Sequence, residues 1–381
     1  MPLKVMTIFG TRPEAVKMAP LVKELESRRE IESICCITAQ HRQMLDDVLS
    51  LFAITPHYDL DIMEAGQSLY TITSKCLLGL EEVFSREKPD LVLVHGDTST
   101  TFAGALAAFY QKIAVGHVEA GLRTGYRYSP FPEEMNRTLV GDLAQYHFCP
   151  TPANRANLEA EGITEGIFLT GNTVIDALKT TVRADYRFRT DLLNTLDYAG
   201  RKVILVTCHR RENYGQPMEN IMKALRRLAE DFPDTELVYP VHLSPVVQQV
   251  ARAHLSGHER IHLIDPLTPD EMHNLMARSY FVMTDSGGLQ EEAPALGRPV
   301  LVLRRETERP EAVTAGTVRL AGTEEEAIYA QAARLLTEPA AYEAMAKAVN
   351  PYGDGCACRR IVDAILWKEG LSDQPPEEFS V

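Results

Sequence analysis

The stretch "LVLVHGDTSTTFAGALAAFYQKIAVGHVEAG", residues 91–121, reads as a strand, a helix and a second strand. Two short apolar runs rich in β-branched residues, 90–95 and 113–119, are the expected strands, and the longer stretch between them is the expected helix. Short apolar runs and longer amphipathic stretches alternate in this way along the whole chain. Such alternation indicates βαβ units and parallel sheets.

The expected strands form two groups with a polar stretch between them. They are residues 4–9, 33–38, 90–95, 113–119, 146–149 and 167–170 in the first half, and 203–207, 236–241, 261–264, 280–284 and 300–303 in the second. The best linker is 171–198, and a chain of 381 residues is longer than one core usually needs. We therefore predict an α/β fold in which two Rossmann-like, doubly wound domains face each other across a cleft.

The composition narrows the class of protein. Hydrophobic residues make up 45% of the chain and charged residues 24%, which is typical of a soluble globular protein. The formal net charge of -14 argues against a protein that coats nucleic acid or an anionic membrane. Seven cysteines, an odd number, make a poor disulfide framework, and no signal peptide or membrane span is apparent. We expect a cytoplasmic protein.

Polar residues follow most of the expected strands. Open α/β sheets bind ligands beyond the carboxyl ends of their strands, so these residues are the candidates for a site. They are 10–14, 96–98, 119–123, 209–213, His242 and 285–288.

The acidic candidates are Asp97, Glu119 and Glu133. A carboxylate at the end of a buried strand needs a partner or a task, because burying it unpaired costs a few kcal/mol. Neighbouring strand ends would bring Asp97 and Glu119 together, and clustered carboxylates can supply an acid and a base. A Mg²⁺ site is the alternative. Glu134 and Arg137, at helical spacing, read as an ordinary exposed pair.

The cationic candidates suit a phosphate group. The segment "FGTRPEAVKMAP", residues 9–20, lacks G-x-G-x-x-G, which disfavours NAD, and Arg12 near a helix N-terminus can bind an anion. A surface arginine is the alternative for so short a motif. In "VTCHRRENYG", residues 206–215, His209 and two arginines can neutralise a dianionic leaving group, and His209 can protonate it.

The segment "MTDSGGLQEEAPALG", residues 283–297, has the features of a nucleotide-diphosphate loop. Small residues at Ser286, Gly287 and Gly288 let backbone N–H groups approach a diphosphate. Glu292, one helical turn further on, can accept hydrogen bonds from both ribose hydroxyls. A turn that merely needs flexible glycines fits less well.

The segments quoted above resemble the non-hydrolysing UDP-N-acetylglucosamine 2-epimerase family. Further matching segments are "TAQHRQML", "SPFPEEMNR", "GNTVIDAL", "VYPVHLSP" and "NPYGDG", and all of them occur in order from about residue 3 to 366. The resemblance implies the glycosyltransferase-B arrangement and a cytoplasmic homodimer. It implies an N-terminal domain of residues 1–170 and a UDP-binding domain of 171–365. A final helix at about 356–368 would pack back on the first domain, and we expect 369–381 to be frayed.

The resemblance also assigns roles to residues. It implies acid/base carboxylates at Asp97, Glu119 and Glu133 with a catalytic His209, and the substrate or UDP would contact Arg12, Lys17, Arg137, Arg210, His242, Ser286, Gly287, Gly288 and Glu292. A second UDP-N-acetylglucosamine would act as an allosteric activator at Gln40, His41, Gln43 and Gln67. No NAD, metal, nucleic acid or membrane partner is expected.

The implied reaction is epimerisation at C2 of the sugar. Because that C–H lies beside an acetal carbon, direct deprotonation is implausible, and the expected route expels UDP to give a 2-acetamidoglucal. Protonation from the other face and return of UDP then yield UDP-N-acetylmannosamine for cell-surface polysaccharide. A hydrolysing epimerase, a glycosyltransferase of the same architecture and a non-catalytic nucleotide-sugar sensor are the alternatives.

Overall fold

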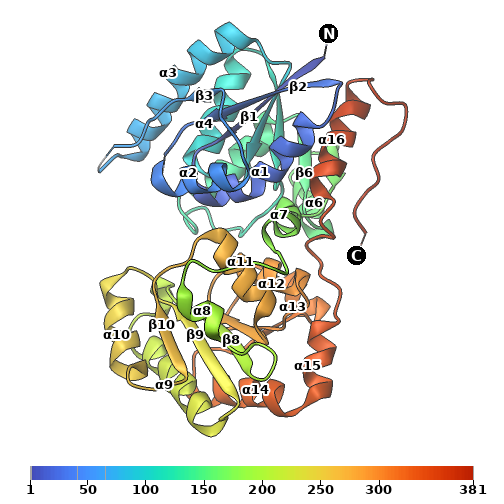
Figure 1. Ribbon diagram of the computed structural model, residues 1–381. Coiled ribbons are helices and arrows are strands. Elements are labelled where there is room, and N and C mark those ends of the chain that lie inside the picture. The colour runs from blue at the N-terminus through green and yellow to red at the C-terminus, as the bar shows by residue number, and fades with distance from the viewer. Residues whose placement is uncertain (1, 41, 65, 381) are drawn as a thin grey trace. The chain divides into compact units, whose positions relative to one another are not determined.

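The computed structural model describes residues 2–40, 42–64 and 66–380, except for the side chains of Gln43 and Met44. The chain divides into two compact units (Figure 1). Unit 1 runs to Thr180 and resumes at Tyr352, and unit 2 is Thr181–Pro351.

Unit 1 is built on a parallel sheet. In the described residues its order is β3-β2-β1-β4-β5-β6-β7. The strands are β1 (Leu3–Phe9), β2 (Ile31–Ile37), β3 (Tyr58–Asp59), β4 (Leu91–His95), β5 (Ala114–Val118), β6 (Tyr146–Cys149) and β7 (Ile167–Leu169). Every residue of β4 is buried, as expected for a strand that helices cover on both faces.

Helices cover both faces of this sheet. They are α1 (Arg12–Glu26), α2 (Arg42–Leu51), α3 (Leu69–Glu87), α4 (Ser99–Tyr110), α5 (Glu133–Leu143), α6 (Pro152–Ala160), α7 (Thr173–Thr181) and α16 (Ala357–Lys368). Val5 and Phe9 pack with α1 and α16, whereas Met6 and Ile8 pack with α3 and α4. This alternation follows from the two-residue period of a strand.

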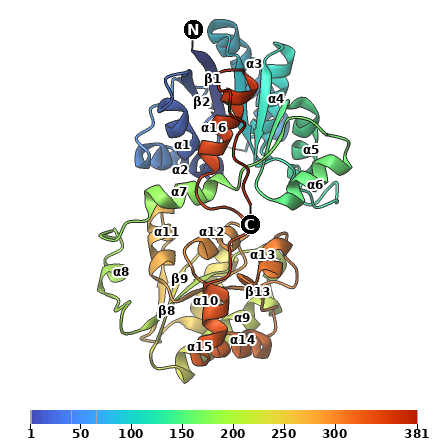
Figure 2. The same cartoon turned by 90° about the vertical axis from the view of Figure 1, so that its right-hand side faces the viewer.

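The boundary of unit 1 lies after α7 rather than at residue 170. The buried carboxylate of Asp176 on α7 accepts hydrogen bonds from the backbone N–H groups of Ala357 (3.1 Å) and Cys358 (2.9 Å), which open α16. Helix α16 packs against α1 (Figure 2). Asp176 therefore fastens α16 to α7, and both helices belong to unit 1.

The last residues form an extended segment that packs on unit 1. The composition of 369–381 predicts a frayed end. The described part of this segment is instead packed, because Phe379 gives it an apolar side chain to bury. Phe379 is 5% exposed, its N–H donates to the carbonyl of Leu169 (2.8 Å), and the Arg360 guanidinium lies 5.5 Å from its ring centre. Arg155 also pairs with Glu378.

Unit 2 repeats the plan of unit 1. The order of its described parallel strands is β10-β9-β8-β11-β12-β13. The strands are β8 (Lys202–Thr207), β9 (Thr235–Pro240), β10 (Ile261–Ile264), β11 (Phe281–Thr284), β12 (Val300–Val302) and β13 (Val318–Leu320). The helices are α8 (Asp191–Thr195), the 3₁₀ helix η1 (Arg211–Asn213), α9 (Gln216–Asp231), α10 (Pro245–Leu255), α11 (Pro269–Arg278), α12 (Leu289–Ala295), α13 (Pro310–Ala315), α14 (Glu325–Thr337) and α15 (Pro339–Ala346).

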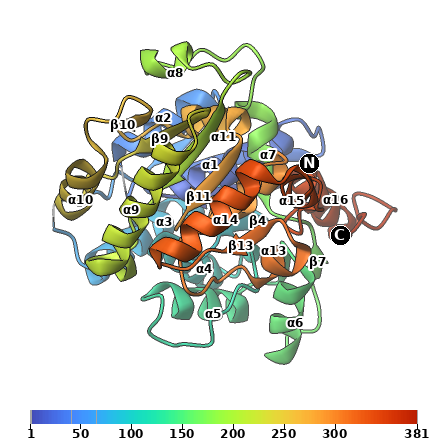
Figure 3. The same cartoon turned by 90° about the horizontal axis from the view of Figure 1, so that it is seen from below.

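Helices α9 and α14 lie side by side on this sheet, as Figure 3 shows, and they share its main apolar core. Among the helices of the described chain, none has the length and apolar character that a bilayer crossing requires. The predicted fold class, α/β with two Rossmann-like domains, is confirmed.

Each sheet has one switch point, at which the order of the strands changes direction. This point marks where a ligand is expected to bind. The reversal lies between β1 and β4 in unit 1 and between β8 and β11 in unit 2. Doubly wound sheets bind ligands at the carboxyl ends of such strands. The segments that follow these strand ends are residues 10–14 and 96–98 in unit 1, and 208–213 and 285–288 in unit 2.

Candidate active site

Glu119 follows β5 with a left-handed backbone, φ 63°. Residues other than glycine rarely adopt this conformation, and bulky ones that do are held by their surroundings, often at functional sites. Its carboxylate pairs with Lys17 and accepts a hydrogen bond from Asn172 Nδ2 (2.8 Å). The side chain is only 13% exposed. Lys17 of α1 and Asn172 before α7 therefore hold a largely buried carboxylate on a residue whose backbone is strained.

His95, at the end of β4, lies beneath this carboxylate. Its Nε2 is 3.7 Å from Glu119 Oε2 and has no hydrogen-bond partner among the described residues. Burial lowers the pKa of His95 to about 4, so the imidazole is neutral at pH 7. In the next strand burial lowers the pKa of His117 to about 3, and this neutral ring contacts the Gly96 carbonyl through Nε2 (2.7 Å).

Asp97 is held by α5. Arg137 Nη2 lies 2.5 Å from Asp97 Oδ2, and Asn136 Nδ2 donates to the Asp97 carbonyl (2.9 Å). The neighbouring Gly96 connects Asp97 to Glu119, because a Cβ built on Gly96 would lie 3.8 Å from Glu119 Oε1. Asp97 and Glu119 therefore lie at adjacent strand ends, and each has its own cationic partner.

The prediction that Glu134 and Arg137 form an ordinary exposed pair is wrong. They are 4% and 5% exposed, and Glu134 accepts hydrogen bonds from the N–H groups of Thr124 (3.0 Å) and Gly125 (2.9 Å). Helical spacing identifies a shared face of α5 but cannot say whether that face points inward.

Glu133 is the first residue of α5 and is partly exposed. It precedes Asn136 and Arg137 by three and four residues, so it shares the helix face that contacts the Asp97 loop. Within the described chain its carboxylate has no hydrogen bond or ion pair. Of the three predicted carboxylates, Glu133 is thus the one that a ligand could engage without displacing a protein group.

Arg12 is the first residue of α1, and it is partly exposed with no ion pair to any described residue. The neighbouring Glu14 lies within the candidate stretch 10–14 but was not singled out, and it is buried. Glu14 accepts hydrogen bonds from the Thr11 N–H (2.9 Å) and the Thr98 hydroxyl (2.9 Å). It therefore connects the start of α1 to the start of α4. The T-x-x-E capping-box pattern at Thr11 was the available signal.

In unit 2 the His209 loop is held by Asp285, another residue that the sequence reasoning did not single out. Asp285 Oδ2 accepts hydrogen bonds from the N–H groups of His209 and Arg210, both at 2.8 Å, and from Asn213 Nδ2 (3.1 Å). The His209 ring stacks on His242, with ring centres 5.3 Å apart. Two predicted site residues, His209 and His242, are thus brought into contact.

Gly287 lies beside two guanidinium groups. A Cβ built on Gly287 would lie 3.7 Å from Arg210 Nη2 and 3.7 Å from Arg309 Nη2. Arg309 is a third residue that the sequence reasoning missed, and it also pairs with Glu291. A turn without a side chain, flanked by two permanently charged forks, suits a dianionic diphosphate.

Glu292 and Ser286, at the two ends of the predicted nucleotide-binding segment, differ in their contacts within the protein. Glu292 is 14% exposed, and its Oε2 lies 3.4 Å from His273 Nε2. The Ser286 N–H, in contrast, already donates to Thr284 Oγ1 (2.9 Å), so this backbone group is engaged within the protein.

Two of the four predicted activator residues are brought together. Gln67 Nε2 donates to the Gln40 carbonyl (3.4 Å), and Gln40 Oε1 accepts from the Thr100 hydroxyl (3.2 Å). Gln43 lies in α2 with its side chain undescribed, and His41 lies outside the described residues.

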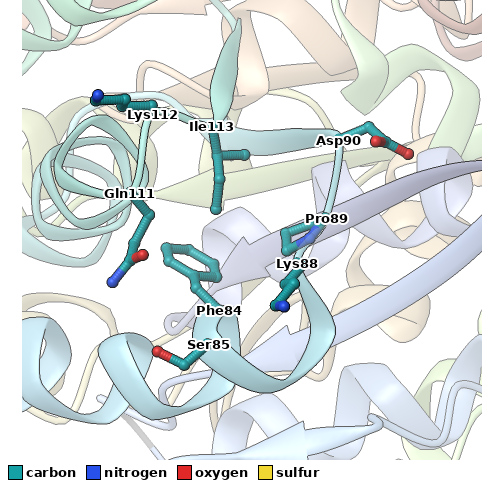
Figure 4. A pocket seen from close by; sticks show the side chains of 8 residues that line it. All are labelled: Phe84, Ser85, Lys88, Pro89, Asp90, Gln111, Lys112 and Ile113. Atoms are coloured by element: carbon teal, nitrogen blue, oxygen red, sulfur yellow. The ribbon is translucent and has the colours of Figure 1, made fainter.

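A surface pocket of about 590 Å³ lies at the amino-terminal ends of β4 and β5 (Figure 4). It is lined by Phe84, Ser85, Lys88, Pro89, Asp90, Gln111, Lys112 and Ile113. Because doubly wound sheets bind ligands at the opposite strand ends, this pocket is no candidate for the active site. In the part of the chain that the structure describes, no three His, Cys, Asp or Glu side chains gather as a metal site.

The fold and these two groups of residues define a class of protein. Two Rossmann-like units with charged side chains at their switch points have the glycosyltransferase-B fold. A glycotransferase of kitacinnamycin shares this fold at 12% identity, with a TM-score of 0.65 over 96% of this chain and 98% of that one.

The comparisons with known proteins then identify the family. Residues 23–366 match the family described as UDP-N-acetylglucosamine 2-epimerase. The chain is 58% identical to the UDP-N-acetylglucosamine 2-epimerase of Bacillus subtilis strain 168, over 99% of each chain. It is 49% identical to UDP-GlcNAc 2-epimerase from Neisseria meningitidis bound to UDP-GlcNAc, with a TM-score of 0.86 over 96% of this chain and 100% of that one. The chain therefore belongs to the UDP-N-acetylglucosamine 2-epimerase family, and the predicted resemblance is confirmed.

Proposed function

We propose that the protein reversibly epimerises C2 of UDP-N-acetylglucosamine to give UDP-N-acetylmannosamine, without net hydrolysis. The observation that carries the proposal is Glu119, whose backbone is strained and whose carboxylate is held by Lys17 and Asn172, in a chain of this family. Strain of this kind persists where a side chain must stand in one place.

The chemistry requires UDP to leave first. The C2 hydrogen becomes acidic when oxocarbenium character develops at C1, so loss of UDP and loss of that proton together give 2-acetamidoglucal. Arg210 and Arg309 beside Gly287 supply positive charge for the departing diphosphate, and His209 supplies a proton. Arg12, which forms no ion pair with a described residue, adds a further cation.

The unit 1 carboxylates then exchange protons with the two faces of C2. Asp97 pairs with Arg137, and Glu119 pairs with Lys17. The carboxylate of Glu133 has no ion pair or hydrogen bond within the described chain. Different surroundings are what give two carboxylates separate acid and base roles. In this scheme neither NAD nor a metal ion takes part.

Further features belong to the same proposal. A second UDP-N-acetylglucosamine would bind at Gln40 and Gln67 as an activator, which their contact and the Thr100 hydrogen bond support.

Homodimer formation is supported by exposed apolar side chains on α3, where Tyr70 is 88% and Leu78 is 66% exposed. Free thiols at all seven cysteines fit a cytoplasmic enzyme that supplies N-acetylmannosamine units for surface polysaccharide.

A proton NMR time course with UDP-N-acetylglucosamine in heavy water tests the proposal. We expect UDP-N-acetylmannosamine with deuterium at C2 and an equilibrium mixture of the two UDP-sugars. Accumulation of free UDP with free N-acetylmannosamine would instead establish the hydrolysing reaction. An unchanged substrate spectrum would identify a binding protein or a transferase that lacks its acceptor.

A further inference from the structure

Asp285 is fully buried, and the two oxygens of its carboxylate differ in their hydrogen-bond partners. Oδ2 accepts three hydrogen bonds from the His209 loop, as described above. Oδ1 has no hydrogen-bond partner among the described residues, and it lies 3.4 Å from Nδ1 of His209. A carboxylate oxygen that is buried without a donor is costly unless a positive charge faces it.

The surroundings of His209 show which group can stabilise a charged ring. His242 stacks on one side, and Arg210 follows in the chain. Burial, His242 and Arg210 all lower the pKa of His209, and Asp285 opposes them. Cys208 and Tyr239 beside Asp285 stay neutral because burial raises the pKa of each. Asp285 is therefore the carboxylate that can balance an imidazolium at this position.

We propose that Asp285 is a positioning residue that holds His209 with Nδ1–H directed at Oδ1 and Nε2 directed at the ligand. The catalytic part of this inference rests on the proposed function. As the C1–O bond breaks, its electron pair leaves with UDP, and the Nε2 proton passes to a phosphate oxygen. His209 is left neutral, with its remaining proton on Nδ1. When UDP adds back, the same proton returns to Nε2.

The substitution Asp285→Asn tests this arrangement. An amide can present its oxygen to the three N–H donors and its NH₂ to Nδ1, so the loop is kept while Nδ1 becomes an acceptor. In protein labelled with ¹⁵N-histidine, with His209 assigned through His209→Gln, we expect the Nδ1–H form in the wild type and the Nε2–H form in Asp285→Asn.

Kinetics give a second readout. We expect kcat to fall about 10²- to 10⁴-fold in Asp285→Asn, because the wrong tautomer removes general acid catalysis by His209. Its pH profile should move to lower pH because the imidazolium loses its partner, while the Kd for UDP changes less than about 3-fold. In a His209→Gln background the same change should cost less than about 3-fold, since residues that act as a unit are not additive.

The matched control is Asn213→Ala, which removes one donor to Oδ2 and leaves Oδ1 untouched. It should alter thermal stability without altering the His209 tautomer or the pH profile. A wild-type His209 protonated on Nε2 would overturn the proposal even if Asp285→Asn does not fold. If the wild type shows the Nδ1–H form but does not epimerise the substrate, the proposed function fails and the positioning role stands.

Discussion

Replacing Glu119 by glycine and by alanine isolates the backbone strain at the candidate active site. Both changes remove the carboxylate and its contacts with Lys17 and Asn172, so they differ only in how readily residue 119 adopts φ 63°. A left-handed backbone costs residues other than glycine about 1–2 kcal/mol, and glycine loses part of this advantage through its freer unfolded state. We expect Glu119→Gly to be more stable than Glu119→Ala by about 1 kcal/mol.

For a domain of this size that difference corresponds to a Tm higher by about 2–4 °C. Differential scanning calorimetry of the two purified variants, with the wild type as reference, measures it. Both variants should be inactive as epimerases because the carboxylate is gone. If Glu119→Ala is as stable as Glu119→Gly, residue 119 does not adopt the left-handed conformation, and the claim that the fold strains its backbone to place this carboxylate is refuted.

Three further predictions concern residues of unit 1. Asn172→Ala removes a hydrogen bond to a charged group, worth about 1.5–3 kcal/mol, so kcat should fall about 10- to 100-fold with little change in the Kd for UDP; an unchanged kcat would exclude Asn172 from holding Glu119. Phe379→Ala should destabilise unit 1 by about 3 kcal/mol in denaturant unfolding, because a buried ring is lost, and a change below about 0.5 kcal/mol would show that the end segment does not pack there. Burial lowers the pKa of His95 to about 4 and of His117 to about 3, so the unfolded state binds more protons than the folded state below pH 6.5. The contribution of these histidines to the free energy of unfolding is full above that pH and should fall by about 2 kcal/mol per histidine at pH 5. Between pH 7 and 5, His117→Gln should therefore lose less stability than the wild type.

Residues of the candidate site that directly follow strands could be located from the sequence. Glu119, Asp97 and the 285–288 loop could be located because apolar runs end just before them. The partners could not be found in the same way. Asn172 is 53 residues from Glu119 in the chain, and no local pattern links the two. The left-handed backbone of Glu119 also had no signal, because glycine is the residue that usually marks it.

Other differences arose where a local pattern was silent about burial. The spacing of Glu134 and Arg137 is the same for an exposed pair and for an inward face, and only the packing of α5 on the Asp97 loop decides between them. Asp285 precedes the small residues of its loop and gave no separate signal, although it organises the His209 loop. The Pro- and Glu-rich end segment packs through a single residue, Phe379, which average composition cannot reveal.

In the proposed reaction, the bond between C1 and the UDP oxygen breaks during each epimerisation. UDP-N-acetylglucosamine carrying ¹⁸O in that bridging position tests it most directly. We predict that, while C2 exchanges with solvent, rotation of the β-phosphate before UDP returns spreads ¹⁸O to the non-bridging oxygens of that phosphate in the recovered UDP-sugars. Epimerisation with all of the ¹⁸O still in the bridging position would speak against elimination of UDP.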